Sequence, residues 1–365
     1  KVKIMKKIKL YIFHPYSRIG GADLSLSRLI NNLDGKKYSI TFITLEKPRI
    51  KFYLKKKIEI NIIKKKRAIY SLFEIRKIVK KSKNKFSKII FLSNQNFANI
   101  ISVFALTRIN WIKLILIERN NPIELDYSKK FKDKLIKILI KATYRFSDKI
   151  ISISKELGRD LQKICNKNVS TIYNASYDLN IFKLAKKKMV KKNKIILNVA
   201  RFEKQKNHIM LLKSFKDIHE QINAKLILIG YGSEKKNILD YINKYNLKKK
   251  VLLITDSKNL FSYFKIADLF VLTSIYEGFG NVLVEAGMFK IPIISTNCKS
   301  GPKEILNNGK FGDLVNVGDT KKLSKLILKN LKKPNKDKVL KMYKSLKIFN
   351  IKEHVTKYEK IFDKI

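Results

Sequence analysis

Two glutamates flank a glycine-rich turn in the second half of the chain. Glu277 precedes the turn 278–280 (GFG), and seven residues separate it from Glu285. The apolar run 268–273 (DLFVLT) predicts a buried parallel strand before the turn, and a helix is expected to begin near Gly280. Backbone N–H groups at a helix start, backed by the positive end of the helix dipole, form an anion site. The turn therefore predicts a site for a phosphate.

The two carboxylates indicate what else the ligand carries. Glu285, one to two turns into the predicted helix, could accept hydrogen bonds from sugar hydroxyls beside the anion, while Glu277 would point toward the group that the anion carries. A phosphate with hydroxyls on both sides describes a nucleotide-sugar. The alternative is an ordinary strand, turn and helix with surface glutamates, so the interpretation depends on this structural context. The other ligand-facing positions at the turn are Phe279, Gly280, Asn281 and Val282.

Three further motifs accompany this turn. They are 20–23 (GGAD), 197–206 (LNVARFEKQK) and 300–306 (SGPKEIL). With them, the chain resembles the retaining glycosyltransferases of family 4 over nearly its whole length. The resemblance implies an α/β fold of the GT-B architecture, in which two Rossmann-like domains face a central cleft. The third motif is similar to a signature of the subgroup that builds surface polysaccharides and lipid-linked oligosaccharides.

The resemblance also implies roles for four of these residues. Arg201 and Lys206 match the positions that hold the donor diphosphate, and Gly20 and Gly21 match an N-terminal glycine loop that could approach a phosphate or the acceptor. Physical chemistry supports the basic pair, because arginine supplies a planar fork of donors and lysine a point charge. Both residues follow an apolar run that predicts a strand, and ligands of open α/β sheets bind at the carboxyl edge. The alternative is that they are two solvated side chains among 81 basic residues.

Four other residues are candidates for contacts with the donor or acceptor. His14 ends the first predicted strand. Many members of the family have a histidine after the strand that corresponds to 113–117, where this chain has Arg119 and Asn120. We expect these two residues to take over part of its contact with the donor sugar. Gly230 follows another predicted strand and lies near the nucleotide in the family, with a purely structural turn as the alternative.

The length and the order of the predicted elements divide the chain into domains. At 365 residues the chain suits two domains with separate cores. Strands and helices alternate in both halves, which implies parallel sheets. The predicted divisions are an acceptor-side domain 1–175, a linker 176–193, a nucleotide-sugar-binding domain 194–349 and a C-terminal helix 350–365.

Two predicted helices carry informative stripes. In the C-terminal helix an apolar stripe (Ile351, Val355, Tyr358 and Phe362) predicts packing against the N-terminal domain, with packing on its own domain as the alternative. In the predicted helix 128–146 a basic stripe lies beside an apolar one, as in a helix at a lipid interface. The basic stripe is Lys130, Lys134, Lys137 and Lys141, and the apolar stripe is Phe131, Leu135, Ile138 and Ala142. A half-buried domain helix with a solvated face is the alternative.

The composition favours some partners and compartments over others. The formal charge of +52 suggests a nucleic-acid partner. Lysine is, however, spread evenly along the chain and accompanied by abundant isoleucine and asparagine, which is the composition that an AT-rich genome would produce. Without a zinc-finger spacing or an RNA-binding aromatic signature, we expect no specific nucleic acid and instead an attraction to anionic membranes. Two distant cysteines fit a reducing compartment, and no run reaches 18 apolar residues. These features predict a cytoplasmic protein that is peripheral at the inner face of the cytoplasmic membrane.

Together these features predict a metal-independent glycosyltransferase with no cofactor besides its UDP-sugar donor. The donor would be a UDP-N-acetylhexosamine or UDP-hexose, and the acceptor a lipid-linked or lipopolysaccharide glycan. Arg201, Lys206 and the helix dipole would stabilise the departing UDP, where negative charge develops. Glu277 would contact the donor sugar and Glu285 the ribose. No residue stands out as a covalent nucleophile, which is compatible with the front-face mechanism favoured for the family.

Three alternatives stay open at this point. A sugar-nucleotide epimerase of the same fold would need a general base in the N-terminal half, where histidine is scarce. A non-catalytic sugar-nucleotide-binding protein would not need all four of Glu277, Glu285, Arg201 and Lys206. A nucleic-acid-binding protein would rely on the charge alone.

Overall fold

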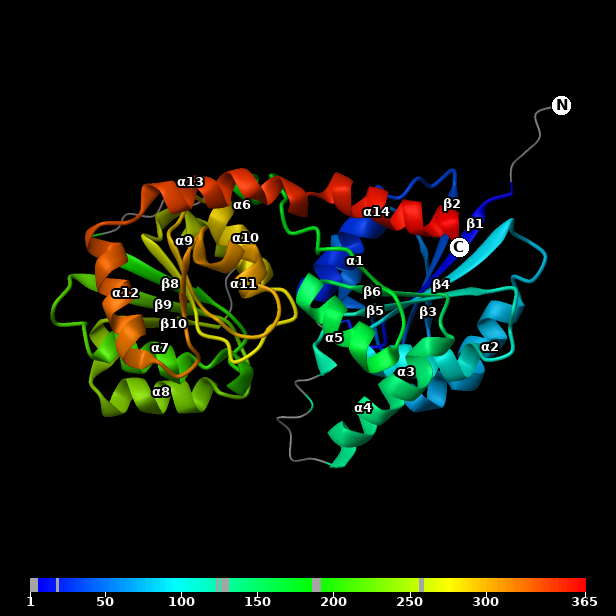
Figure 1. The fold of residues 1–365 in the computed structure, drawn as a ribbon, viewed down its shortest axis with the longest axis horizontal. Helices are drawn as coiled ribbons and strands as arrows, with labels where there is room; N and C mark the ends of the chain where they lie inside the picture. The colour runs from blue at the N-terminus through cyan, green and yellow to red at the C-terminus, as the bar shows by residue number, and fades with distance from the viewer. Residues whose placement is uncertain (1–5, 18–19, 123–124, 126–130, 186–191, 256–258) are drawn as a thin grey trace. The chain divides into compact units, whose positions relative to one another are not determined.

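The computed structural model describes residues 6–17, 20–122, 125, 131–185, 192–255 and 259–365. The chain divides into two compact units (Figure 1). Unit 1 comprises Lys1–Ala175 and Ile351–Ile365, and unit 2 comprises Ser176–Asn350. The division after Ala175 means that the segment expected to be a linker belongs, in its described part, to unit 2. There Tyr177 forms a bridge with Asn350, and helix α6 (Asn180–Leu184) follows.

Unit 1 is built on a seven-stranded sheet in the order β3-β2-β1-β4-β5-β6-β7. Every strand pair in it is parallel. The strands are β1 (Ile8–Phe13), β2 (Tyr38–Thr44), β3 (Glu59–Ile62), β4 (Lys88–Asn94), β5 (Lys113–Glu118), β6 (Lys149–Ser152) and β7 (Val169–Thr171). The central strands are nearly continuous runs of Ile, Leu and Phe, as expected for a parallel sheet that is buried on both faces.

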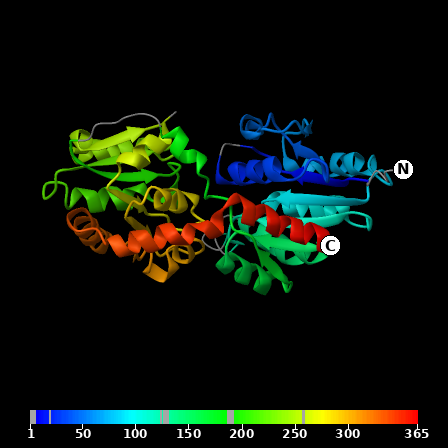
Figure 2. The same cartoon turned by 90° about the horizontal axis from the view of Figure 1, so that it is seen from above.

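Helices cover both faces of this sheet (Figures 1 and 2). They are α1 (Gly21–Asn32), α2 (Leu72–Lys80), α3 (Asn96–Leu106), α4 (Phe131–Thr143), α5 (Lys155–Cys165) and α14 (Ile351–Lys364). The C-terminal helix α14 packs beside α1. Its Phe362 contacts the ring of Tyr38 with centroids 5.9 Å apart, and Lys37 forms an ion pair with Asp363 at 2.8 Å. Val355, Tyr358 and Phe362 of its apolar stripe are thereby buried in unit 1, and Ile351 is partly exposed.

Unit 2 repeats the plan with six parallel strands in the order β10-β9-β8-β11-β12-β13. The strands are β8 (Lys194–Val199), β9 (Ala224–Ile229), β10 (Val251–Ile254), β11 (Leu269–Leu272), β12 (Ile293–Thr296) and β13 (Asp313–Val315). Besides α6, its helices are α7 (His208–Lys216), α8 (Lys235–Lys244), α9 (Leu260–Ile266), α10 (Asn281–Met288), α11 (Pro302–Ile305), α12 (Thr320–Lys332) and α13 (Lys336–Ser345). In Figure 1, α7 and α8 lie below the strands and α9, α10 and α13 lie above them.

Both sheets contain a point at which the strand order reverses. In unit 1 the chain runs outward from β1 to β3 and then returns to place β4 on the other side of β1. In unit 2 the corresponding strands are β8 and β11. Ligands of open α/β sheets bind outside the carboxyl ends of the strands at such a reversal. The fold therefore selects the segments after β8 and β11 in unit 2, and after β1 and β4 in unit 1.

Candidate active site

The segments after β8 and β11 are joined by hydrogen bonds. The Thr273 hydroxyl donates to the carbonyl oxygens of Lys206 and Asn207, each at 3.1 Å. The N–H of Ile275 donates to the carbonyl of Gln205 at 2.8 Å, and the Gln205 amide donates to the carbonyl of Tyr276. These bonds fix the short 3₁₀ helix Lys204–Lys206 against the turn that carries Glu277.

The carboxylate of Glu277 has two partners, and both use the same oxygen. Lys206 Nζ lies 2.5 Å from Glu277 Oε1, and the Ser274 hydroxyl donates to Oε1 at 2.6 Å. The side chains of Lys206 and Glu277 are 13% and 8% exposed. Among the described residues nothing donates to Oε2. One oxygen of Glu277 is thus held by the protein, and the other remains available to a ligand.

Arg201 lies at the start of the same loop and is exposed. Within the described part of the chain its guanidinium forms no ion pair or hydrogen bond. The loop itself is supported by Gly230, where an added Cβ would lie 1.9 Å from the carbonyl oxygen of Ala200. The N–H of Phe202 also donates to the carbonyl of Tyr231 at 2.7 Å. Gly230 therefore allows the close contact that positions the Arg201 loop.

A second close contact shapes the turn before α10. Gly280 has φ +96° and precedes the first residue of α10, and the Phe279 side chain is buried against Phe349 with ring centroids 5.3 Å apart. Gly301 has φ +82°, and a Cβ there would lie 1.9 Å from the carbonyl oxygen of Phe279. The glycine of the segment 300–306 is therefore needed for that segment to lie against the turn.

Helix α10 places the remaining predicted residues of unit 2. Asn281 and Val282 form its first turn, and the Asn281 amide oxygen accepts a hydrogen bond from the Ser176 hydroxyl at 2.7 Å. Glu285 lies one turn further along and is 7% exposed. Two carboxylates, a lysine, an arginine and a helix start are thus brought to one reversal point, where they could bind an anion flanked by hydroxyls.

His208, directly after the basic motif, is a further buried residue of this region. It is the first residue of α7, is 2% exposed, and packs edge-on against Phe202 with centroids 5.0 Å apart. Neither ring nitrogen has a hydrogen-bond partner among the described residues. Burial, together with the nearby charge of Lys206, lowers the pKa of His208 to about 4. The ring is therefore neutral and adds no charge beside Lys206.

In unit 1 the reversal point holds a chain of buried polar side chains. Asn94, at the end of β4, donates from its amide to His14 Nδ1 at 2.8 Å. The other ring nitrogen of His14 lies 3.4 Å from Asp23, whose carboxylate accepts a hydrogen bond from Ser17. The amide oxygen of Asn94 accepts a hydrogen bond from Arg119 Nε. His14 is 1% exposed, so its predicted ligand contact would require a ligand that reaches this buried chain.

Arg119 continues this chain and is itself only 5% exposed. Its Nη1 donates to the amide oxygen of Asn174 at 2.8 Å. The preceding residue, Glu118, folds back and accepts the backbone N–H groups of Arg119 and Asn120 at 2.9 and 3.2 Å. Burial raises the pKa of Glu118 to about 7, against the opposing effect of the hydrogen bond from Tyr144. Arg119 is thus fixed by protein groups, whereas Asn120 is exposed.

The glycine pair lies at the start of α1, at the same end of the sheet. Gly20 precedes the helix in an extended conformation, with φ −158° and ψ 179°, and Gly21 is its first residue. This backbone at Gly20 is open to any residue type, so the structure requires no glycine there on conformational grounds. The N–H groups of the first turn of α1 have no partner within the helix, as at any helix start.

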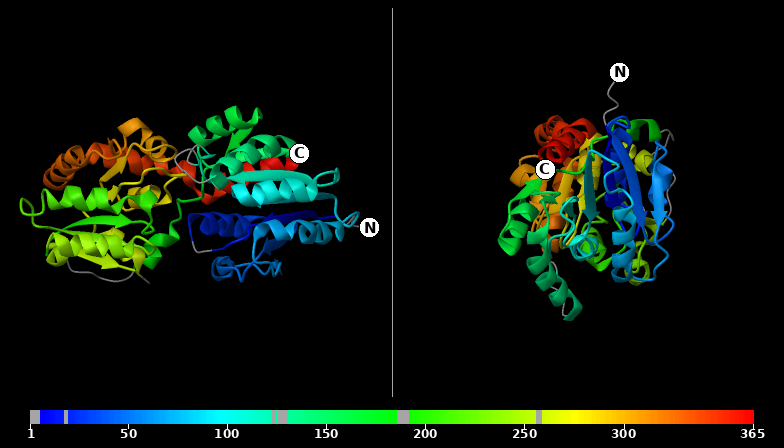
Figure 3. Two further views of the ribbon diagram at one scale, coloured as in Figure 1. Left: turned by 90° about the horizontal axis from the view of Figure 1, so that it is seen from below. Right: turned by 90° about the vertical axis from the view of Figure 1, so that its right-hand side faces the viewer.

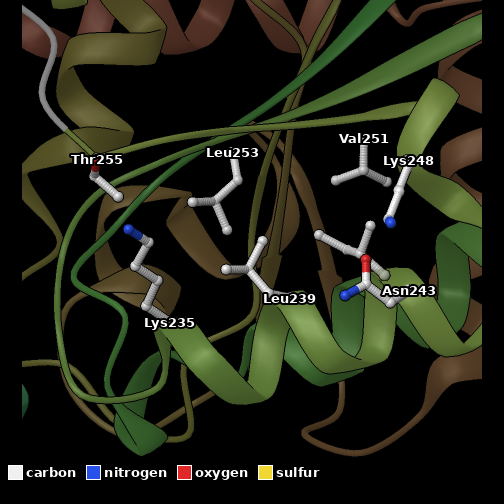
Figure 4. A pocket seen from close by; sticks show the side chains of 8 residues that line it. Lys235, Leu239, Asn243, Lys248, Val251, Leu253 and Thr255 are labelled. Carbon is white, nitrogen blue, oxygen red and sulfur yellow. The ribbon is translucent and has the colours of Figure 1, made fainter.

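A separate cavity of about 410 Å³ lies between α8 and the edge strand β10 (Figure 4). Lys235, Leu239 and Asn243 of α8 face Val251 and Leu253 of the strand. It contains none of the predicted site residues. Elsewhere in the described chain, no group of three or more His, Cys, Asp or Glu side chains is arranged to hold a metal ion.

The fold and the site define an α/β protein of two Rossmann-like units with a candidate phosphate site at the reversal point of the second sheet. Residues 181–346 match the family described as glycosyl transferases group 1. An N-acetylgalactosamine-N,N'-diacetylbacillosaminyl-diphospho-undecaprenol 4-alpha-N-acetylgalactosaminyltransferase of Campylobacter jejuni is 30% identical over 262 residues, 71% of this chain and 70% of that protein. The chain belongs to the group 1 glycosyltransferases.

Two other relatives support this assignment. The amylovoran biosynthesis glycosyltransferase AmsD of Erwinia amylovora is 26% identical over 83% of this chain and 84% of that protein. An uncharacterized glycosyltransferase of Methanocaldococcus jannaschii is 33% identical over 64% of this chain, and the match spans 61% of that relative's length.

Solved structures share the fold over the whole chain. HepE of Anabaena in complex with UDP and glucose superposes with a TM-score of 0.81 at 17% identity, covering 99% of this chain and 100% of that one. The lipopolysaccharide outer core galactosyltransferase WaaB in its apo form gives a TM-score of 0.73 at 18% identity, covering 98% and 100%. The predicted α/β class with two Rossmann-like domains is confirmed.

Proposed function

We propose that this chain transfers a sugar from a UDP-sugar, with retention of the anomeric configuration and without a metal ion, to a lipid-linked or lipopolysaccharide glycan. The observation that carries the proposal is the Lys206–Glu277 pair at 2.5 Å, placed at the reversal point of unit 2 in front of α10. A cation and a carboxylate with one unused oxygen suit a ligand that presents a phosphate beside sugar hydroxyls.

Each residue then has a defined part in the reaction. Arg201, exposed and without an ion-pair partner in the described chain, would bind the diphosphate together with Lys206 and the first N–H groups of α10. These groups would stabilise the negative charge that develops on the departing UDP. They would thereby supply the charge stabilisation that a metal ion would otherwise provide. Glu277 Oε2 would accept a hydrogen bond from a hydroxyl of the donor sugar. Glu285 would accept hydrogen bonds from the ribose hydroxyls.

The choice of donor and acceptor follows the named relatives. The Campylobacter relative is named for an N-acetylgalactosamine transfer to a diphospho-undecaprenol-linked glycan, and WaaB for a galactose transfer in the lipopolysaccharide outer core. HepE was solved with UDP and glucose. By likeness we assign a UDP-N-acetylhexosamine or UDP-hexose to this chain, and an acceptor anchored in a membrane.

An exposed face of unit 1 supports work at a membrane surface. In α4 the residues Ile136, Ile140 and Thr143 are buried, while Phe131 is 81% and Ile138 is 64% exposed. Lys134 and Lys141 lie beside them and are also exposed; Lys130 lies outside the described residues. Figure 3 (right) shows α4 at the margin of unit 1, with one end projecting away from the sheet.

The neighbouring helix α3 extends this apolar face. Helix α3 contacts α4 and exposes Phe97 (37%) and Phe104 (45%), with Lys132 Nζ 5.3 Å from the Phe97 ring. An exposed apolar face rimmed by lysines suits the interface of an anionic bilayer. No described helix is long and apolar enough to cross a membrane. We therefore propose that unit 1 docks on the inner face of the cytoplasmic membrane.

The test is a panel of donors followed by a transfer assay. A ligand that binds only the folded state raises the melting temperature. We expect UDP-GlcNAc, UDP-GalNAc, UDP-glucose or UDP-galactose to raise it more than GDP-mannose, and the best donor to support transfer with a retained anomeric configuration by NMR. A shift with GDP-mannose alone, or transfer with inversion, would contradict the proposal.

A further inference from the structure

We propose that Ser274 is a positioning residue for Glu277, whose hydroxyl holds this carboxylate in place after Lys206 has turned to the donor diphosphate. The inference rests on the proposed function. It concerns a residue that precedes the glycine turn and that touches the carboxylate rather than the substrate.

The starting point is competition for one ammonium group. Lys206 Nζ lies 2.5 Å from Glu277 Oε1. A diphosphate carries more charge than a carboxylate and would bind the same ammonium group strongly. As Lys206 moves toward the diphosphate, its hold on Glu277 weakens. The only other described donor to this carboxylate is Ser274, at 2.6 Å.

The surroundings of Ser274 suit this part. Its side chain is fully buried, so no bulk water competes for the hydroxyl. Its carbonyl oxygen accepts a hydrogen bond from the Thr296 hydroxyl at 2.6 Å, which anchors the peptide to the end of β12. Because the hydroxyl bonds to Oε1, it leaves Oε2 without a donor among the described residues.

Removing the hydroxyl should therefore affect the binding of UDP and the binding of a UDP-sugar differently. Without Ser274 Oγ, no described donor holds the Glu277 carboxylate at the sugar position once Lys206 has turned to the diphosphate. UDP lacks the donor sugar that Glu277 contacts, so its affinity should not change. A UDP-sugar should lose the part of its affinity that depends on the sugar, and turnover should fall.

The experiment measures the affinities of UDP and of the best UDP-sugar by calorimetry, and kcat and KM by transfer assay, for Ser274→Ala, Ser274→Thr and Ser214→Ala. Ser214 is the matched control, because among the described residues its buried hydroxyl bonds only to the carbonyls of Met210 and Thr320. We expect Ser274→Ala to leave the Kd of UDP within about twofold and to lower kcat by roughly tenfold or more, the size of one hydrogen bond to a charged group. Ser274→Thr, which keeps a hydroxyl, should recover most of the turnover.

Other outcomes overturn the inference in distinguishable ways. If Ser274→Ala weakens UDP as much as UDP-sugar and lowers the melting temperature beyond the Ser214→Ala control, Ser274 merely supports the loop. If Ser274→Ala has wild-type kinetics, the hydroxyl positions nothing. If the wild-type chain itself neither binds nor transfers from any UDP-sugar, the proposed function fails and this inference fails with it.

Discussion

At the scale of single residues, the site depends on how Glu277 divides its two oxygens. Oε1 bonds to Lys206 and Ser274, and Oε2 is left for a ligand. A partly buried ion pair of this kind is weak evidence for stability, because desolvation offsets much of the attraction. Its significance lies in placing a cation and an acceptor oxygen side by side at the end of β8 and β11.

This division separates the effects of two conservative substitutions. Glu285→Gln should weaken UDP binding, since a ribose contact is made in the ground state and the transition state alike. Glu277→Gln should mainly lower kcat, because the sugar it contacts develops charge only in the transition state. Calorimetry with UDP and steady-state kinetics on both variants measure the two effects. A Glu277→Gln enzyme with weak UDP binding and normal kcat would exchange the assigned roles.

The residues of this site differ in how far they could be predicted from sequence. Glu277 and Glu285 were selected from the local pattern of strand, glycine turn and helix, whereas Arg201 and Lys206 were selected by the family resemblance together with their position after a predicted strand. The bond between His14 and Asn94 joins residues 80 positions apart. Whether two such side chains meet depends on the register of β1 and β4, which a single sequence does not specify.

At the scale of elements, Gly230 connects the β9 turn to the Arg201 loop. We expect Gly230→Ala to lower the free energy of unfolding by about 2 kcal/mol or more, since its Cβ would meet the carbonyl oxygen of Ala200 at 1.9 Å. The displaced loop should also bind UDP more weakly. Gly35→Ala is the control, because nothing lies within 4 Å of a Cβ there. Urea unfolding of both variants gives the comparison, and equal stability would contradict the close contact.

The buried His208 at the start of α7 should make stability depend on pH. Burial lowers its pKa from 6.5 to about 4, so between these pH values the unfolded chain binds a proton that the folded chain refuses. The free energy of unfolding therefore falls as the pH drops from 6.5 to 4, by an amount on the order of 3 kcal/mol at the lower limit.

His208→Phe removes the titrating imidazole, and it breaks no hydrogen bond among the described residues. Stability of the variant should fall less steeply over the same range, as measured by urea unfolding at each pH. Glu118 acts in the opposite direction, because its raised pKa of about 7 makes the folded chain bind the extra proton above pH 4.5. It is present in both proteins, so the difference between them isolates His208. Parallel curves would contradict the buried, neutral ring.

The elements themselves were mostly predictable where the apolar pattern is long. The apolar run 268–273 contains β11 (Leu269–Leu272), and the expected C-terminal helix 350–365 is α14 (Ile351–Lys364). The strands β7 and β13 have only three residues each, too few for a period to show. Helix α6 was missed because its five residues lie in a polar segment that reads as a linker.

At the scale of the whole molecule, the proposed membrane contact belongs to unit 1. Changing Lys134, Lys137 and Lys141 of α4 to glutamine should reduce co-sedimentation with anionic liposomes severalfold, since each lysine near such a surface contributes about 1 kcal/mol. The matched control changes Lys321, Lys322 and Lys325 of α12, three exposed lysines of unit 2, and so removes the same charge. Equal losses in both variants would show that net charge alone, and not this face, drives binding.

The central claim is that the loop after β8 binds the donor diphosphate, and calorimetry with UDP tests it most directly. Arg201→Ala and Lys206→Ala should each weaken UDP binding by about 1.5–3 kcal/mol, the range for hydrogen bonds to charged groups. Lys204→Ala, an exposed lysine of the same loop, should bind UDP like the wild type. Unchanged UDP affinity in both the Arg201 and Lys206 variants, with the fold intact by thermal unfolding, would contradict the account.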